Sequence, residues 1–299
     1  MHDSVQSELF RTVKQRILAI VDKLKTIENV AIFATADLES IVSLAFLESA
    51  MIDANIPYSR KILHSTNDQP KGEEYSFEST SSMVISIEQF EDTWDIDQID
   101  DQGRVRILPL AVSVNHPNST RFHNGALDVV IQCSAIAAAL APNGTRVRRL
   151  RHLAGSGHWL RDSLDNSYDP VYTKIRDTLQ NEGSIRVVPI PELSNPITEM
   201  IPDFPESMFK RLHKKWPKMN FEQRKQAMSE LALPVLLDSK LSTPRLEELL
   251  WFRIIFGDAE IDLHSLIFTI KRDWPKEAER GKSYAAGVLK SLISTGGFE

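Results

Sequence analysis

Acidic, amide and imidazole side chains stand after several apolar runs of this 299-residue chain. The positions are Asp37, Glu39, Glu88, Asn115, His116 and His158. Carboxylates and imidazoles that gather around a pair of divalent metal ions can activate a water molecule against a phosphate ester. The five acids and histidines of this set are therefore candidate metal ligands. Structural explanations compete with metal binding at Asp37, Glu88 and the two histidines. For Asp37 we favour an N-cap of the helix that begins near Ser40.

Two basic clusters have the residue types that bind nucleic acid. Four arginines fall within six residues, and a second cluster interleaves cations with Phe209 and Trp216. The cations are Arg146, Arg148, Arg149 and Arg151 in the first cluster, and Lys210, Arg211, Lys214, Lys215 and Lys218 in the second. Cations bind phosphates and aromatic rings stack on bases, so both clusters are candidates for binding single-stranded DNA. Solvated faces that balance nearby acids are the alternative explanation.

Short apolar runs alternate with helical stretches up to about residue 140. Strands are expected at 30–34, 58–63, 83–87, 105–108 and 110–114, and helices at 5–27, 41–54 and 129–140. This alternation predicts an α/β fold with a largely parallel sheet and helices on both of its faces. Because ligands of such folds bind at the carboxyl ends of the strands, the acids and histidines that follow the strands mark a candidate site.

The sequence changes character after about residue 165. Prolines punctuate an irregular stretch that contains one expected strand at 185–188, and helices are expected at 221–231, 244–256, 262–270 and 278–294. We therefore predict two domains: an α/β domain over residues 1–165 and a mostly helical region over 166–299.

Composition narrows the class of protein. The net charge of −6 argues against a uniformly basic nucleic-acid-binding surface, although a local basic groove stays compatible with it. The single cysteine, Cys133, excludes an intramolecular disulfide and suits a reducing compartment. No apolar run approaches the roughly 20 residues that span a bilayer, and the first ten residues lack the apolar core of a signal peptide. We expect a cytoplasmic protein without membrane partners.

The order of these motifs resembles the DHH phosphoesterase superfamily, which includes the RecJ exonucleases. In that family, four motifs at strand ends bind two manganese ions. The corresponding segments here are 35–40 (TADLES), 84–88 (VISIE), 114–117 (VNHP) and 153–158 (LAGSGH). A predicted strand precedes each of the first three, and an alanine-rich helix separates the third from the fourth.

The resemblance also shows how far the motifs have degenerated. Asp37 keeps an acid of the first motif, whereas Glu39 and Glu88 replace aspartates. Val114 and Asn115 replace the Asp and the first His of the signature triplet, so only His116 of that triplet remains, and His158 stands where the last Asp is expected. Loss of these ligands implies that the chain has no metal cofactor and no catalytic residues, and that the six positions are vestigial.

Degenerate RecJ-like proteins of this kind include the helicase cofactors of the CMG complex and their archaeal counterparts. The resemblance implies a role in DNA replication at the nucleoid, with GINS and MCM helicase subunits as partners and single-stranded DNA as a further ligand. The alternative is a manganese-dependent phosphoesterase or exonuclease on nucleotides or short oligonucleotides. A freestanding single-stranded nucleic-acid binder is a third possibility.

Overall fold

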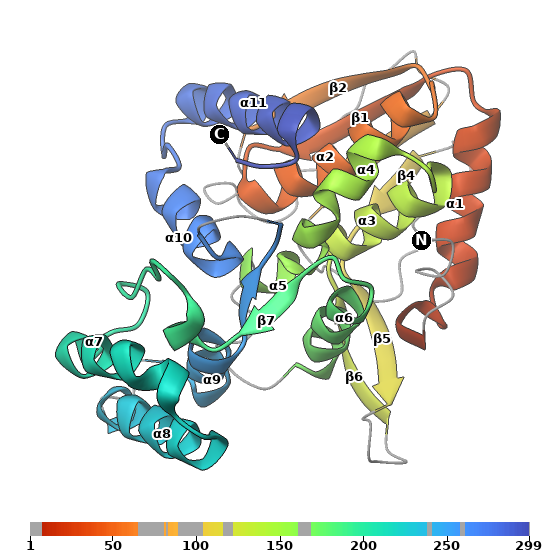
Figure 1. The fold of residues 1–299 in the computed structure, drawn as a ribbon. Coiled ribbons are helices and arrows are strands. Elements are labelled where there is room, and N and C mark those ends of the chain that lie inside the picture. Colours follow the sequence, from red (N-terminus) through yellow and green to blue (C-terminus); the bar gives the residue numbers. More distant parts are fainter. Residues whose placement is uncertain are drawn as a thin grey trace. The chain divides into compact units, whose positions relative to one another are not determined.

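The computed structural model describes residues 8–64, 81, 83–88, 104–115, 122–160, 169–237, 241–257 and 261–298 (Figure 1). Two compact units make up the chain. The first comprises residues 1–157, 170–175 and 274–299, and the second comprises 158–169 and 176–273. The domain boundary predicted after residue 165 lies outside the described residues and stays a prediction.

The first unit is built around a parallel sheet. The strands of this unit are β1 (Val30–Thr35), β2 (Tyr58–Leu63), β3 (Met83–Ile87), β4 (Arg104–Ile107), β5 (Leu110–Asn115) and β6 (Phe122–Leu127). Its helical elements are η2 (Glu8–Phe10), α1 (Lys14–Thr26), α2 (Leu38–Asp53), α3 (Val129–Leu140), α4 (Thr145–Leu150), η4 (Arg151–Gly155) and α11 (Ala278–Thr295). Strands β2, β1, β3 and β4 pair in this order and are parallel throughout. The predicted α/β fold class is confirmed.

The order of the strands reverses direction at β1. The chain passes from β1 through α2 to β2 on one side, and then places β3 on the other side of β1. In register, Ile32 of β1 lies opposite Arg60 of β2 and opposite Ile85 of β3. In open parallel sheets, ligands bind beyond the carboxyl ends of the strands at such a reversal.

Burial explains why β1 becomes a central strand of the sheet. All six residues of β1 are buried, so both faces of the strand are covered, as its apolar residues on both parities predict. Helix α2 is buried along most of its length and packs on α3, whose small side chains permit close approach. Helix α11 contacts α2 and β2, and α1 contacts α3 (Figure 1).

Strands β5 and β6 differ from the prediction. The segment 110–114 was expected in the parallel sheet, but β5 instead pairs with β6 as a separate antiparallel hairpin, with Leu110 opposite Leu127. Burial along β5 alternates, which is typical of a hairpin with one covered face. The sequence of β6, FHNGAL, lacks an apolar pattern, and the strand therefore depends on its partner.

The second unit is mostly helical. It contains the strands β7 (Arg186–Val188) and β8 (Arg253–Ile255), and the helical elements η6 (Ile190–Glu192), α7 (Glu206–Lys215), η7 (Trp216–Lys218), α8 (Phe221–Leu237), α9 (Thr243–Trp251) and α10 (Leu263–Asp273). Two more helices, α5 (Gly157–Leu160) and α6 (Pro170–Asn181), cross the division between the units. Neither α6 nor α7 was predicted.

The helix predicted over 244–256 is too long. Helix α9 ends at Trp251, and Arg253–Ile255 after it forms β8, which pairs antiparallel with β7. The intrinsic preferences of three residues are too weak to decide between helix and strand, so pairing with β7 determines that β8 is a strand. No helix in the described ranges is both long and apolar enough to cross a membrane.

Candidate functional site

The carboxyl ends of β1 and β3 form the sheet edge at which the sequence predicts a site. Asp37 follows β1 and Glu88 follows β3, and these two strands are neighbours in the sheet. The structure therefore brings both acids to the edge where strand order reverses. The hydrogen-bond and ion-pair partners of each carboxylate determine whether it could bind a ligand or a metal ion.

Asp37 is the N-cap of α2, as the sequence analysis favoured. Its backbone is extended, and its Oδ1 accepts a hydrogen bond from the backbone N–H of Ser40 at 2.9 Å. Its Oδ2 accepts a hydrogen bond from Oγ1 of Thr35, which also lies 2.8 Å from Oγ of Ser40. Both carboxylate oxygens are therefore engaged by neighbours within the same turn.

Glu88 forms an ion pair with Arg106 of β4. The guanidinium Nε lies 3.0 Å from each carboxylate oxygen, and Nη2 donates to Oε2 as well. Ser86 adds a hydrogen bond to Oε1 at 2.7 Å. Bidentate pairing with a guanidinium is among the stronger arrangements available to a carboxylate. Arg106 was not predicted as part of the site, although it lies in the strand expected over 105–108.

The backbone at the end of β1 is also occupied. Trp274 donates its indole N–H to the carbonyl oxygen of Ala36 at 3.1 Å, and its ring packs edge-on against Tyr284 of α11 at 5.1 Å. The N–H of Ala36 donates to the carbonyl of Leu63 at 2.9 Å. A half-buried aromatic side chain thus covers the peptide that links β1 to Asp37.

The other predicted ligands have different surroundings where the structure describes them. Glu39 is in the first turn of α2 and is 6% exposed. Burial raises the pKa of the Cys133 thiol on α3, and the nearby charge of Glu39 raises this pKa further. Asn115 ends β5, which belongs to the separate hairpin. His116 lies outside the described residues. His158 is 2% exposed, belongs to the second unit, and its Nε2 lies 3.1 Å from Oδ2 of Asp169.

The segment predicted as the fourth motif has a packing role at Gly157. A Cβ atom at this position would lie 2.2 Å from Oδ1 of Asp128. Asp128 is buried and caps α3 by accepting from the backbone N–H of Ile131 at 2.9 Å. The glycine therefore permits a close approach to a helix cap. In the described ranges, no three His, Cys, Asp or Glu side chains gather in a way that could hold a metal ion.

All four arginines around α4 donate to groups of the first unit. Arg146 donates to Asp53 at 2.9 Å, and Arg149 donates to the carbonyl of Ser294 at 2.6 Å. Arg151 is 5% exposed and donates to Ser134 at 2.9 Å. Arg148 is exposed and donates to Asn143 at 3.0 Å, so its guanidinium lies at the surface.

The lysines of the second cluster are exposed on α7 and η7, but the aromatic residues between them are not. Phe209 is 6% exposed and Trp216 is 3% exposed. Trp216 donates to Oε1 of Glu192 at 2.9 Å and lies under the guanidinium of Arg224 at 4.9 Å. Lys214 and Lys215 therefore line a surface whose interleaved aromatic rings belong to the core.

Comparisons with known proteins include a structural likeness of low sequence identity. The sequence matches no protein-family model, and no curated protein matches it. A solved structure with a similar chain trace is the crystal structure of CDC45 from Entamoeba histolytica, at a TM-score of 0.44 and 12% sequence identity. The match covers 94% of this chain and 73% of that chain. A likeness at this level does not place the chain in a family.

Proposed function

We propose that the chain is a non-catalytic, RecJ-like DHH protein of DNA replication, which acts as a scaffold between GINS and the MCM helicase. One observation carries the non-catalytic part. At the sheet edge where a ligand of this fold would bind, Asp37 caps a helix and Glu88 is held by Arg106. A two-metal phosphoesterase needs such carboxylates for its metal ions.

The residues at this edge do not fit a manganese pair. A cation would have to displace the N–H of Ser40 from Asp37 and the guanidinium of Arg106 from Glu88. Asn115 offers an amide where the family has an imidazole, and His158 is paired with Asp169 in the second unit. We therefore assign no catalytic step to a metal ion in this chain.

The replication role rests on the resemblance of the four motifs and their order. A fold that keeps its strands and loses its metal ligands retains surfaces that can bind other proteins. GINS and MCM subunits are the partners that this resemblance suggests. Single-stranded DNA is a further proposed ligand, and within the arginine cluster Arg148 and Arg149 are the candidates whose side chains are exposed.

Affinity purification of the tagged chain from its own cells tests the scaffold role. We expect GINS and MCM subunits to be recovered at near-stoichiometric levels by mass spectrometry. Recovery of neither would overturn the proposal. Manganese-dependent hydrolysis of a short oligonucleotide by the purified chain, abolished by Asp37→Asn, would support the alternative enzyme instead.

Binding of a fluorescent oligo(dT) tests the DNA contact separately. The double variant Arg148→Glu/Arg149→Glu should weaken binding and reduce the salt dependence by roughly 0.7 in log–log slope for each lost phosphate contact. The matched control is Lys23→Glu/Lys25→Glu, which changes two exposed cations of α1 in the same unit. Equal binding and equal slopes in the two variants would remove DNA from the proposal.

A further inference from the structure

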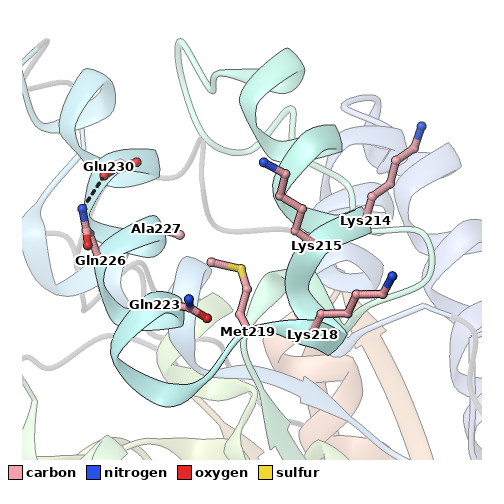
Figure 2. A pocket seen from close by; sticks show the side chains of 8 residues that line it. All are labelled: Lys214, Lys215, Lys218, Met219, Gln223, Gln226, Ala227 and Glu230. Atoms are coloured by element: carbon pink, nitrogen blue, oxygen red, sulfur yellow. Dashed lines mark hydrogen bonds between the residues drawn. The ribbon is translucent and has the colours of Figure 1, made fainter.

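A basic groove lies between α7 and α8 in the second unit (Figure 2). Its volume is about 520 Å³, and its lining residues are Lys214, Lys215, Lys218, Met219, Gln223, Gln226, Ala227 and Glu230. Figure 2 shows the ammonium group of Lys215 and the thioether of Met219 between the helices, whereas the ammonium groups of Lys214 and Lys218 extend away from α8 in this view. Gln226, Ala227 and Glu230 come from the facing helix.

Local hydrogen bonds fix the turn at the end of this groove. Asn220 accepts from the backbone N–H of Gln223 at 2.9 Å, and Gln223 accepts from the backbone N–H of Asn220 at 3.0 Å. This reciprocal pair is a capping box that starts α8. The N–H of Met219 donates to the carbonyl of Trp216 at 3.1 Å, and the Trp216 ring is anchored by Glu192 and Arg224. The two walls are therefore positioned before any ligand arrives.

The groove has an excess of positive charge. Three lysines line it against a single acid, Glu230, which accepts a hydrogen bond from Gln226 at 3.0 Å. Within the described part of the chain, Lys214, Lys215 and Lys218 make no ion pair and no hydrogen bond through their ammonium groups. Unpaired cations that line a groove attract anionic ligands and favour those with complementary charge spacing.

The remaining lining residues favour a peptide over single-stranded DNA. Non-specific binders of single strands stack bases on aromatic rings, whereas no aromatic residue lines this groove. Phe209 and Trp216 are buried, and the exposed Phe221 is not among the lining residues. Met219 offers an adaptable apolar contact of the kind that peptide-binding surfaces use. The amide of Gln226 can donate to and accept from a peptide backbone.

We propose that this groove binds an acidic peptide segment of a partner protein, with carboxylates at the three lysines and an apolar side chain against Met219. The inference goes beyond the scaffold role and does not rest on it, because it uses only the charge, shape and lining of the groove. A failure to recover GINS or MCM would leave it standing.

Fluorescence anisotropy with the full-length chain tests the proposal. The probe is a short fluorescein-labelled peptide of alternating Glu and Leu, and the control peptide carries Gln in place of Glu. The triple variant Lys214→Glu/Lys215→Glu/Lys218→Glu should weaken binding of the acidic peptide by about tenfold or more. The matched variant is Lys210→Glu/Arg211→Glu/Lys225→Glu, which makes the same charge change at exposed positions outside the groove. It should change the affinity far less.

Three outcomes would overturn the inference. One is an equal loss of affinity in both triple variants, which would show general electrostatic attraction and no groove. Another is equal binding of the acidic and Gln peptides, or binding of neither. The third is that the chain does not bind the peptide but binds oligo(dT) tightly, and that both the groove variant and Phe221→Ala weaken this binding. That result would assign the surface to single-stranded DNA. Far-ultraviolet circular dichroism checks that each variant is folded.

Discussion

Arg106 holds Glu88 through both carboxylate oxygens, with its Nε 3.0 Å from each. The pair joins β4 to the residue that follows β3, at the sheet edge where strand order reverses at β1. A carboxylate in this position would otherwise be available to a ligand or metal ion. The guanidinium of Arg106, which is permanently charged, therefore pairs with Glu88 in the position that a metal ion would need.

We expect Mn²⁺ to leave the thermal stability of the chain unchanged. A native-state site at an ion concentration about 100-fold above its Kd would add about 2.7 kcal/mol to the free energy of unfolding. A gain of this size is easily detected in thermal unfolding with and without millimolar MnCl2, with MgCl2 as the control. A stabilisation that is specific for Mn²⁺ and lost in Glu88→Gln would contradict the assignment of Glu88 to Arg106.

Substitution of Asp37 should separate helix capping from metal binding. Asp37→Ala removes the acceptor for the N–H of Ser40 and should lower the free energy of unfolding by about 1 kcal/mol. Asp37→Asn keeps an acceptor at the N-cap and should cost less, because Asn and Asp are comparable caps. Urea unfolding midpoints measure both. Equal destabilisation by Asn and Ala would show that the negative charge, and not the cap, is what the position requires.

The parts of the fold that could be predicted from sequence are those fixed by local patterns. The apolar run of β1 on both parities predicts a covered parallel strand, and Asp37 before Ser40 predicts a cap. The hairpin strand β6 and the three-residue β8 could not be predicted, because pairing with β5 and β7 stabilises them and their own sequences do not.

The candidate site divides in the same way. The sequence placed Asp37 and Glu88 directly after strands, because strand ends are local features. That these two strands are neighbours is a property of the sheet, which the structure shows. It could not show that Arg106 pairs with Glu88, since this contact spans 18 residues and depends on the register of β3 with β4. It also could not show that Phe209 and Trp216 are buried, because their interleaving with lysines is equally compatible with a stacking surface and an amphipathic helix.

Acidification should destabilise the chain through a buried histidine. Burial and the nearby charge of Arg253 lower the pKa of His264 from 6.5 to about 4. The unfolded chain therefore takes up this proton first, and stability should fall as the pH decreases from about 6.5 towards about 4. His152, whose pKa burial also lowers to about 4, acts in the same direction.

The variant His264→Gln tests the contribution of this group. In that pH window, the slope of the free energy of unfolding against pH should be smaller for the variant than for the wild type. The expected difference is about 1.4 kcal/mol per pH unit, which corresponds to the uptake of one proton. The matched control, His213→Gln, changes an exposed histidine of α7 and should keep the wild-type slope. Identical slopes for all three proteins would show that His264 is not the titrating group.

The stability of the second unit should depend strongly on the buried ion pair between Arg253 and Asp262. Both side chains are fully buried, and Nε of Arg253 lies 3.2 Å from Oδ1 of Asp262. Burial alone would raise the pKa of Asp262, but hydrogen bonds and charges from His264, Arg253 and Ser265 outweigh it and lower the pKa. The pair is therefore ionised at neutral pH. Removing one member leaves the other charge buried without its partner.

Arg253→Leu should accordingly lower the free energy of unfolding by about 3–5 kcal/mol, because the carboxylate of Asp262 then stays in the interior without its cation. The matched control is Arg272→Leu, which breaks the exposed pair of Arg272 with Glu199 and should cost less than about 1 kcal/mol. Urea unfolding followed by tryptophan fluorescence measures both. Protonation of Asp262 removes this buried negative charge, so the loss in Arg253→Leu should shrink as the pH falls below about 5. The small loss in Arg272→Leu should stay nearly constant. A loss for Arg253→Leu that is no larger than the control would mean that water or another cation neutralises Asp262.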